Sequence, residues 1–349
     1  MPVLGFDIGG ANVKAANSNG RCASRPFAIW KNPAALADEL RVLDSLLPGS
    51  NEIAVTMTAE LADCYETKAE GVTRILAAVQ QIAGVRPVHV WLTTGKFVTP
   101  AEAMAQPLAA AASNWHALAT WTARWTWNQP ALLIDIGTTT TDLIPIDAGR
   151  PSSRGLTDAT RMVAGELVYT GVRRTPLCAV APAVPFQGTL CPLAAEWFAT
   201  TLDVWLLLGE IPEDANDTET ANGRPATRLA AHDRLARQLC CDRLELDPEA
   251  ATAIAQYLAD RQVEQISAAL ENVLRDREPR RTVIISGSGS FLARWIVETH
   301  PRLGDNNEIY QHGSMNRVDI VDMSEELGGA FATAACAYSV AMLARSGTS

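Results

Sequence analysis

The sequence predicts an α/β protein of two lobes that begin on the same local pattern. At 2–18 and again at 131–146, an apolar strand ends in Asp-Ile-Gly and a second strand follows the turn. Strand-like and helix-like segments alternate after each pair, which is typical of a mixed sheet covered on both faces. The 349 residues are 48% hydrophobic, which is enough apolar material for two cores. We therefore expect one lobe at 1–130 and a second at 131–324.

The first lobe is expected to begin with a three-stranded meander. Short apolar runs at about 2–8, 12–18 and 22–30 alternate with turns of Gly, Asn and Ser. A helix is expected next at about 33–46, because Asn32 can cap it and Pro33 suits a first helical turn. The remaining elements are, in order, a strand at 52–58, a helix at about 66–83, a strand at 88–94 and a helical region at about 100–125.

Within that helical region, Trp115, Trp121 and Trp125 recur near helical spacing. Such a stripe is more typical of a core than of a stacking surface for an aromatic substrate. The nearby His116, and His232 later in the chain, give no signal of a catalytic role.

The second lobe is expected to carry a helical insertion at about 190–278. Short strands are expected before it, to about 186, and helices within it at about 192–208, 227–240 and 248–276. The acidic, Asn-rich stretch 209–227 has no periodicity and predicts a loop. A buried strand at 282–286 follows, and the Ala-rich C-terminal helix at about 325–349 is expected to pack back on the first lobe.

Composition excludes several classes of partner. The formal net charge of −10 argues against nucleic acid, which would require clustered basic residues. The longest apolar run, 328–344, is short for a membrane span and rich in alanine, so we expect a buried helix and no membrane partner. The N-terminus shows no signal peptide, and the seven cysteines lack the spacing of a zinc site. These features predict a cytoplasmic protein with reduced cysteines, and they leave an oligomer open.

The first turn, Asp7-Ile8-Gly9-Gly10, has the features of an anion site. Glycines have no Cβ, so their N–H groups can approach a ligand closely. The N–H groups of a tight turn form a concavity that typically holds phosphate. Because Asp7 would repel a bare phosphate, we expect a divalent cation or its water between the carboxylate and the phosphate.

The second turn, from Asp135 to Thr140, repeats this chemistry with hydroxyl groups. Its threonines can donate hydrogen bonds to phosphate oxygens, while Asp135 can hold metal-bound water or accept a proton. Each motif alone is often an ordinary turn, and threonines are common in strands. Because two such motifs open the two halves of one chain, we expect them to face each other across a cleft and to bind one polyphosphate.

A third glycine-rich turn, Gly287-Ser288-Gly289, follows the buried strand at 282–286. It precedes a helical pattern, and the first N–H groups of a helix have no partner within the helix. We expect this turn to form the wall that receives a nucleotide base, a ribose or an equivalent group.

In their order and spacing, the three motifs resemble the superfamily of acetate and sugar kinases, heat-shock ATPases and actin. Within it, the chain resembles the hydantoinase/oxoprolinase-related branch, and more narrowly the family of tetrahydromethanopterin-linked C1 transfer proteins and methanofuran-biosynthesis synthases. The narrower resemblance is carried by GFDIGGANVKAA, TMTAELADCYETKAEGV, AASNWHALA, DIGTTTTDLIP, ELVYTGVRRTPLCA and NGRPATRLAAHDRLARQLCCD. One departure is Asn222, where we expect an acid before Gly-Arg-Pro, and this puts a catalytic acid at that position in doubt.

The resemblance implies a two-lobed, duplicated ribonuclease-H-like (actin-like ATPase) fold with a ligand in a central cleft. It also implies a transferase of one-carbon cofactor (methanofuran-type) biosynthesis. That reaction joins a furan-methyl diphosphate to a γ-glutamyl-tyramine-like phenol, forms an aryl ether and releases diphosphate. The implied partners are therefore a small-molecule diphosphate and a phenolic acceptor, with Mg²⁺ as the implied cofactor.

Several residues then take roles in that reaction by their chemical type. Asp7 and Asp135 would hold Mg²⁺ or its waters, and Lys14 could reach the diphosphate oxygens. The phenol has an ordinary pKa of about 10 and needs a base, for which Asp135 and Asp142 are both candidates. The residues expected to bind phosphate or a cofactor are Gly9, Gly10, Asn12, Gly137, Thr138, Thr139, Thr140, Gly287, Ser288 and Gly289, and of these Gly9, Gly10, Gly137, Thr138 and Thr139 are expected to hold the diphosphate.

The acceptor is expected to contact Arg174, Arg173, Lys68 and Thr170. Arginine offers a planar fork that suits a carboxylate or a phosphate. The alternative interpretation is that the arginines are surface charges and that Lys68 only begins a helix.

Two alternative functions stay open at this point. In the first, the glycine-rich turns bind ATP, and the protein is a kinase or a hydantoinase/oxoprolinase-type hydrolase. In the second, it is a non-catalytic nucleotide switch, although the chain has little length beyond two lobes for partner-binding domains.

Overall fold

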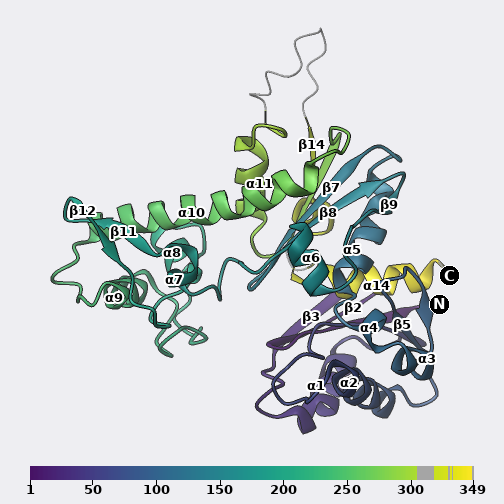
Figure 1. Cartoon of the computed structure of the whole chain (residues 1–349). Helices are drawn as coiled ribbons and strands as arrows, with labels where there is room; N and C mark the ends of the chain where they lie inside the picture. The colour runs from purple at the N-terminus through teal and green to yellow at the C-terminus, as the bar shows by residue number, and fades with distance from the viewer. Residues whose placement is uncertain (305–317, 329–330, 332, 348–349) are drawn as a thin grey trace.

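The computed structural model describes residues 1–304, 318–328, 331 and 333–347. It has two lobes, each built on a mixed sheet, and an arm that extends from the second lobe along one long helix (Figure 1). No described helix is both long and apolar enough to cross a membrane.

The first lobe contains a six-stranded sheet in the order β3-β2-β1-β4-β5-β6. Its strands are β1 (Val3–Ile8), β2 (Asn12–Asn17), β3 (Arg21–Pro26), β4 (Glu52–Met57), β5 (Val88–Trp91) and β6 (Phe97–Val98). Every residue of β1 is buried, because this strand lies in the middle of the sheet with packed layers on both faces. The expected third strand ends early, at Pro26 instead of about residue 30.

Two helices of this lobe lie between its strands in the chain. They are α1 (Leu36–Leu46), which follows the short turn η1 (Pro33–Ala35), and α2 (Lys68–Ala83). Asn32 precedes η1 but its side chain makes no capping hydrogen bond, so that part of the prediction is wrong.

The helical region expected at 100–125 is broken into several pieces. These are α3 (Pro100–Ala105), α4 (Pro107–Ala110), α5 (Asn114–Thr122) and η2 (Ala123–Trp125). Gln106 leaves the helical conformation because a residue before proline clashes with the ring in a helix. Ala112 has a positive φ of 46°, which separates α4 from α5.

The second lobe repeats the architecture of the first. Its sheet has the order β10-β8-β7-β13-β14, with β9 paired to β8. The strands are β7 (Ala131–Ile136), β8 (Thr141–Asp147), β9 (Arg150–Pro151), β10 (Leu167–Val168), β13 (Thr282–Ser286) and β14 (Asp319–Asp322). Two further helices belong to this lobe, α6 (Asp158–Ala164) and α11 (Ser290–Thr299).

The register of the two sheets shows that the lobes are equivalent. In the first sheet Asp7 lies opposite Lys14 on the antiparallel β2, and next to Thr56 on the parallel β4. In the second, Asp135 lies opposite Asp142 on β8, and next to Ser286 on β13. Both aspartates therefore occupy the same position of the same three-strand unit. This repeat confirms the predicted duplicated, ribonuclease-H-like α/β fold.

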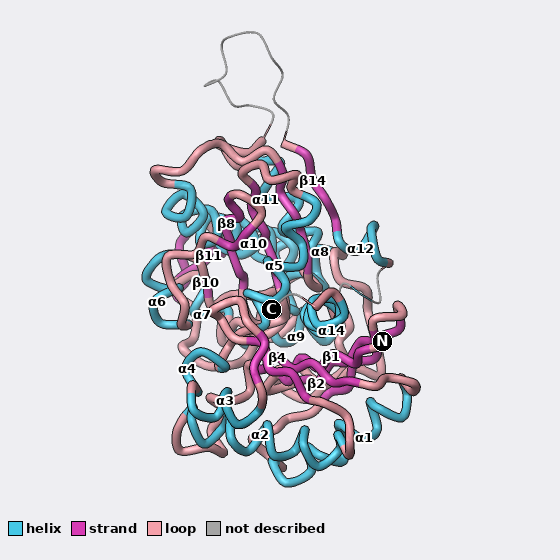
Figure 2. The backbone as a smooth tube through the Cα atoms, turned by 90° about the vertical axis from the view of Figure 1, so that its right-hand side faces the viewer, coloured by secondary structure: helices cyan, strands magenta, loops and turns pink. Residues whose placement is uncertain are grey.

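Two helices pack between the two sheets. α5 and α14 (Ala335–Arg345) lie between the sheets in Figure 2, and they share one hydrophobic core with residues of both central strands. Gly5 of β1 permits this packing, since a Cβ there would lie 2.0 Å from the carbonyl oxygen of Ala337. α12 (Met323–Leu327) ends at Gly328, which has a φ of 88°. The single C-terminal helix expected from about residue 325 is therefore interrupted, and part of that stretch lies outside the described residues.

The arm lies between β10 and β13. It consists of α7 (Leu177–Val180), β11 (Ala183–Phe186), β12 (Thr189–Pro192), α8 (Thr201–Leu208), α9 (Arg228–Gln238) and α10 (Pro248–Leu274). The helix expected at 192–208 begins only at Thr201, because Thr200 and Asp203 form a capping box at that point. The stretch 209–227 is a loop as predicted, held by a bridge between Asp214 and Ala226.

Candidate active site

A cleft of about 500 Å³ lies between the lobes and takes its lining from both. The first lobe contributes the β1–β2 turn and its flanks, together with residues near the start of α5. The second lobe contributes the β7–β8 turn, α6 and the segment after β10. The lining residues are Asp7, Gly9, Gly10, Ala11, Asn12, Lys14, Trp30, Thr58, Ala112, Asn114, Trp115, Asp135, Gly137, Thr138, Thr139, Thr140, Asp142, Asp158, Arg161, Leu167, Tyr169, Arg174 and Cys336.

The two turns predicted to bind phosphate have the same backbone geometry. The Gly9 N–H donates to the carbonyl of Asn12 at 3.0 Å, and the Gly137 N–H donates to the carbonyl of Thr140 at 2.9 Å. A Cβ on Gly9 would lie 2.8 Å from the Asn12 oxygen, so this close turn requires glycine. A Cβ on Gly10 would meet no atom within 4 Å, so the space beside it is open to a ligand.

Asp7 is a buried carboxylate with an unused oxygen. Its side chain is 5% exposed, and Oδ1 has no hydrogen-bond partner among the described residues. Burial raises the pKa of Asp7, while Lys14 opposes that rise. Lys14 lies directly across the antiparallel pair, so both side chains are on the same face of the sheet. The pair leaves one carboxylate oxygen available for a cation.

Asp135 is the corresponding carboxylate of the second lobe. Burial is the main reason that its pKa rises to about 7, and Asp142 raises it further. Lys14 and a hydrogen bond from Ser286 act in the opposite direction. A carboxyl group with a pKa near neutrality can both accept and release a proton at physiological pH.

Asp142 differs from Asp135 because it has a dedicated partner. Arg161 of α6 donates to its Oδ1 at 2.5 Å and to the carbonyl of Glu166 at 3.0 Å. The guanidinium group also lies 4.1 Å from the ring centre of Trp115 in the first lobe. Burial raises the pKa of Asp142, and Arg161 opposes that rise. This ion pair reduces the ability of Asp142 to act as a base.

Arg161 itself could not be predicted from the sequence motifs. It lies in a helix without a recognisable signature, and its side chain is only 1% exposed. Asp158, one turn earlier, also lines the cleft. The only sequence signal for Arg161 is that an arginine lies in the first helix after the second hairpin. Arginines are too common in helices for this to indicate a site.

The oxygen atoms of the site fit Mg²⁺. Asp7 and Asp135 line one cleft, and Asp7 has an orphaned buried oxygen. Within the described residues, no group of three or more His, Cys, Asp and Glu side chains is placed to hold a metal ion. Mg²⁺ typically binds proteins through one or two carboxylates and completes its shell with water and substrate phosphates. The site therefore suits a cation that arrives with a phosphate ligand.

The third glycine-rich turn lies against the end of β7. Gly287, Ser288 and Gly289 are not among the described residues that line the cleft. A Cβ on Gly287, where φ is 90°, would lie 2.8 Å from Oδ1 of Asp135. The Gly289 N–H donates to the carbonyl of Ile136 at 2.9 Å. This turn packs directly against the end of β7, where it supports Asp135.

The four residues expected to bind the acceptor are separated by the fold. Arg174 lines the cleft, with its guanidinium carbon 5.6 Å from the ring centre of Trp30. Arg173 instead forms an ion pair with Asp217 of the arm at 2.6 Å. Lys68 lies 3.9 Å from Asp158, which is a contact between the lobes.

Thr170 has no exposed surface, and its polar atoms are already engaged. Its hydroxyl accepts from Gln262 at 2.9 Å, and its carbonyl accepts from Thr141 at 2.8 Å. This geometry favours a structural role, in which Thr170 connects α10 of the arm to β8.

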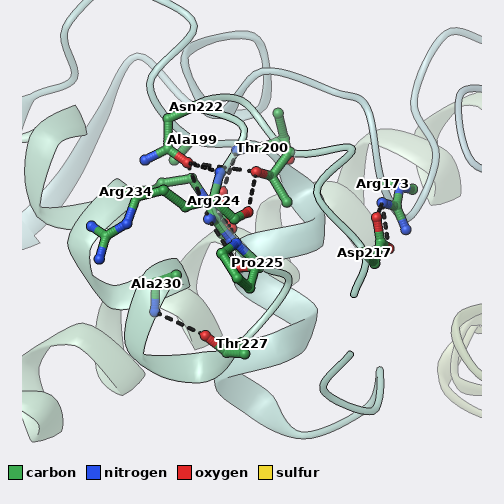
Figure 3. A network of polar contacts seen from close by, with 12 residues as sticks. Arg173, Ala199, Thr200, Asp217, Asn222, Arg224, Pro225, Thr227, Ala230 and Arg234 are labelled. Carbon is green, nitrogen blue, oxygen red and sulfur yellow. Dashed lines mark hydrogen bonds and ion pairs between the residues drawn. The ribbon is translucent and has the colours of Figure 1, made fainter. Parts of the chain in front are cut away.

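The remaining aromatic and polar residues are divided between core and arm. Trp121 is 4% exposed and belongs to the core between the lobes, as the helical spacing predicts, whereas Trp115 also reaches the cleft. His232 lies against the carbonyl of Leu246 at 2.7 Å. Asn222 lies in the arm, where its side-chain oxygen accepts from Arg234 and from the backbone of Arg224 (Figure 3).

Comparison with known proteins agrees with this geometry. The model of the family described as Hydantoinase/oxoprolinase matches residues 51–301. The (4-{4-[2-(gamma-L-glutamylamino)ethyl]phenoxymethyl}furan-2-yl)methanamine synthase of Methanocaldococcus jannaschii is 34% identical over 301 residues, which cover 85% of this chain and 89% of that protein. The synthase of the same name from Methanococcus vannielii is 30% identical over 216 residues, which cover 61% of this chain and 89% of that protein.

A solved structure shows the same fold. The nucleotide-free structure of acetone carboxylase, an enzyme of ATP-dependent acetone carboxylation, matches 97% of this chain and 70% of its own chain. The TM-score is 0.53 at 10% sequence identity, so this likeness concerns the fold alone.

Proposed function

The chain belongs to the hydantoinase/oxoprolinase family, and from its similarity to the two synthases we propose that it is a transferase that joins a furan-methyl diphosphate to a phenol. The synthases from the two methanogens supply the product, an aryl ether between a furan methylene and a γ-glutamylaminoethyl phenol. The observation that carries the proposal is the pair of equivalent turns, which line one cleft with an orphaned carboxylate oxygen beside them.

The proposed reaction exchanges one carbon–oxygen bond for another. The phenolic oxygen forms a bond to the furan methylene carbon, and the bond from that carbon to the diphosphate breaks. The diphosphate leaves with the electron pair of the broken bond, and the phenolic proton passes to a base of the protein. The leaving group therefore gains negative charge, which the site has to neutralise.

The first lobe and the second turn provide that neutralisation. The space beside Gly10 is open to a ligand, and Thr138 and Thr139, whose hydroxyls can donate to phosphate, line the same cleft. Lys14 adds a positive charge close to both aspartates. Asp7 would hold Mg²⁺ through its orphaned oxygen, and the cation would supply charge neutralisation to a bound diphosphate, which leaves Asp135 for proton transfer.

Asp135 is the better of the two candidates for the base. Its pKa of about 7 lets it accept a proton at neutral pH and release it afterwards. Asp142 is committed to Arg161 at 2.5 Å, so a proton on Asp142 would weaken a buried ion pair. We therefore assign proton transfer to Asp135 and the positioning of Arg161 to Asp142.

One incubation tests the proposal directly. Purified protein is mixed with an aminomethyl-furan-methyl diphosphate and γ-glutamyl-tyramine, with and without Mg²⁺, and the ether and inorganic diphosphate are measured by mass spectrometry and a phosphate assay. We expect equal amounts of both products, and only with Mg²⁺. The absence of an ether from folded protein would exclude the transferase.

A parallel incubation with ATP addresses the alternative functions. Release of phosphate from ATP, or transfer of phosphate to an added amide or alcohol, would favour an ATP-dependent hydrolase or kinase. Nucleotide-dependent assembly without turnover, measured by sedimentation, would favour a nucleotide switch.

A further inference from the structure

We propose that Trp30, Tyr169 and Arg174 form the subsite for the acceptor, in which the phenol ring stacks at the mouth of the cleft and Arg174 binds the carboxylate of the acceptor's tail. The inference rests on the proposed function, because it assigns the two substrates to different parts of one cleft. All three residues line that cleft, and they come from both lobes.

Trp30 is fixed relative to the first phosphate-binding turn. The Phe27 N–H donates to the carbonyl of Ala11 at 2.9 Å, and the Ile29 N–H donates to the carbonyl of Gly10 at 3.0 Å. The residue directly before Trp30 is therefore hydrogen-bonded to the turn itself. As a result, the indole is placed beside the site of the diphosphate by backbone contacts and not by a free loop.

Arg174 is fixed in the same way relative to the second turn. Its own N–H donates to the carbonyl of Thr138 at 2.9 Å. The segment approaches the turn so closely that a Cβ on Gly171 would lie 2.5 Å from the carbonyl oxygen of Gly137. Arg174 then reaches across to Trp30, with 5.6 Å between the guanidinium carbon and the ring centre. The cation of Arg174 and the aromatic ring of Trp30, one from each lobe, therefore lie next to each other, each held to its own turn.

The charge of Arg174 is available to a ligand. Among the described residues, no carboxylate lies within ion-pair distance of it, whereas Arg161, Arg173 and Lys68 each have one. The other cations among the described lining residues are engaged deeper in the cleft, since Arg161 is paired with Asp142 and Lys14 lies opposite Asp7 beside the proposed diphosphate site. A carboxylate on the acceptor is therefore attracted to Arg174 at the mouth.

The exposed fractions of the side chains distinguish the mouth of the cleft, at Trp30 and Tyr169, from its floor, at Asp7. Trp30 is 38% exposed and Tyr169 is 64% exposed, whereas Asp7 is 5% exposed. The furan ring is joined to the diphosphate through one methylene group, so it has to stay close to the floor. The acceptor carries a longer tail that has to extend toward solvent. Exposed aromatic faces at the mouth therefore suit the phenol, because aromatic side chains bind planar rings with little loss of side-chain entropy.

The test combines binding with kinetics. The probe is γ-glutamyl-tyramine alone, titrated calorimetrically into the wild-type protein, Trp30→Ala, Trp30→Phe and Arg174→Gln. We expect the Kd to rise at least about tenfold in Trp30→Ala and to recover in Trp30→Phe, which keeps an aromatic face. The Kd for inorganic diphosphate with Mg²⁺ is expected to change less than about twofold. Trp197→Ala is the matched control, since Trp197 is 54% exposed in the arm and does not line the cleft.

A second comparison isolates the carboxylate of the tail. N-acetyl-tyramine has the same phenol and amide without the carboxylate and the ammonium group, so Arg174→Gln is expected to weaken γ-glutamyl-tyramine binding about tenfold and to leave N-acetyl-tyramine binding unchanged. In turnover assays, the KM for the acceptor is expected to rise while the KM for the diphosphate stays constant.

The outcomes distinguish the subsite from the reaction. Failure of the wild-type protein to bind γ-glutamyl-tyramine, or equal binding by wild type, Trp30→Ala and Arg174→Gln, would overturn the subsite even if ether is formed. Acceptor binding that depends on these residues without any ether would support the subsite and exclude the transferase.

Discussion

Asp135 is the residue whose protonation controls the proposed reaction. Burial and Asp142 raise its pKa to about 7, and the base has to be deprotonated to accept the phenolic proton. We expect kcat to rise with pH up to about 7 and then to level off. Asp135→Asn is expected to lower kcat about 100-fold or more and to remove this pH dependence. Single-turnover rates between pH 5 and 9 test this, and an unchanged profile in Asp135→Asn would assign the base elsewhere.

Because the pKa of Asp135 is raised in the folded state, ionisation of this carboxyl lowers the stability of the folded protein. The ordinary pKa of this carboxyl is 3.8 and the folded value is about 7, so between these values the folded state binds more protons than the unfolded state. Stability therefore falls as pH rises through this window and stays lower above it. Asp135→Asn, which is neutral at every pH, is expected to have a higher Tm than wild type at pH 8 and a similar Tm at pH 4.

Asp142→Asn is the matched comparison for that measurement. It leaves the buried guanidinium of Arg161 without its carboxylate, which typically destabilises a protein by about 3–5 kcal/mol. We therefore expect the two substitutions to shift Tm at pH 8 in opposite directions. Parallel shifts would show that the environments of the two aspartates do not differ in this way.

At the scale of secondary-structure elements, the β1–β2 turn makes a prediction about two neighbouring glycines. Gly10→Ala adds a methyl group to open space, so Tm is expected to stay within about 1 °C while the Kd for Mg²⁺-diphosphate rises at least about tenfold. Gly9→Ala places its methyl 2.8 Å from the carbonyl oxygen of Asn12 and is expected to lower Tm as well. Calorimetry and thermal melts separate the two effects. Unchanged diphosphate affinity in Gly10→Ala would remove this turn from the binding site.

The strands and the hairpin turns could be predicted from the sequence because their signals are local. β1, β2, β7 and β8 have alternating or continuous apolar patterns that end at glycine turns. The predicted helix bounds are wrong where a single residue determines where a helix begins or ends. Pro107 divides the expected helical region at 100–125, and the Thr200–Asp203 capping box delays the start of α8. Such effects depend on single side chains and not on periodicity.

The candidate site was predictable in the part that the two turns form and at Arg174, which also lines the cleft. Asp7 and Asp135 were found because each ends an apolar strand at a glycine turn. Arg161 and Trp30 were missed, since one lies in an unremarkable helix and the other in a loop that approaches Gly10 only after folding. Conversely, Thr170 and Arg173 belong to a promising segment, but tertiary contacts with the arm occupy their polar groups. A motif in one segment of the chain does not indicate which contacts that segment makes with distant segments after folding.

At the scale of the whole molecule, the cleft joins two lobes that contact each other through α5, α14 and the Lys68–Asp158 pair. A ligand that binds both turns binds only the folded, assembled cleft. Inorganic diphosphate with Mg²⁺ is therefore expected to stabilise the protein by about 2.7 kcal/mol at 100 times its Kd. Thermal melts with diphosphate alone, Mg²⁺ alone and both together test this, and the combination is expected to exceed the sum of the separate shifts. ATP with Mg²⁺ serves as the comparison ligand.

Because the two hairpins are equivalent, the charges that they carry determine in which direction a substrate lies in the cleft. Opposite Asp7 the chain has Lys14, and at the matching position opposite Asp135 it has Asp142. Two identical halves would offer a substrate two equivalent poses, of which only one is productive. The difference in charge at this single pair removes that ambiguity, because Lys14 attracts the anionic end toward the first lobe, whereas Asp142, paired with Arg161, offers no such attraction. The duplicated scaffold thereby acquires a polarity, with the leaving group held on one side and the proton acceptor on the other.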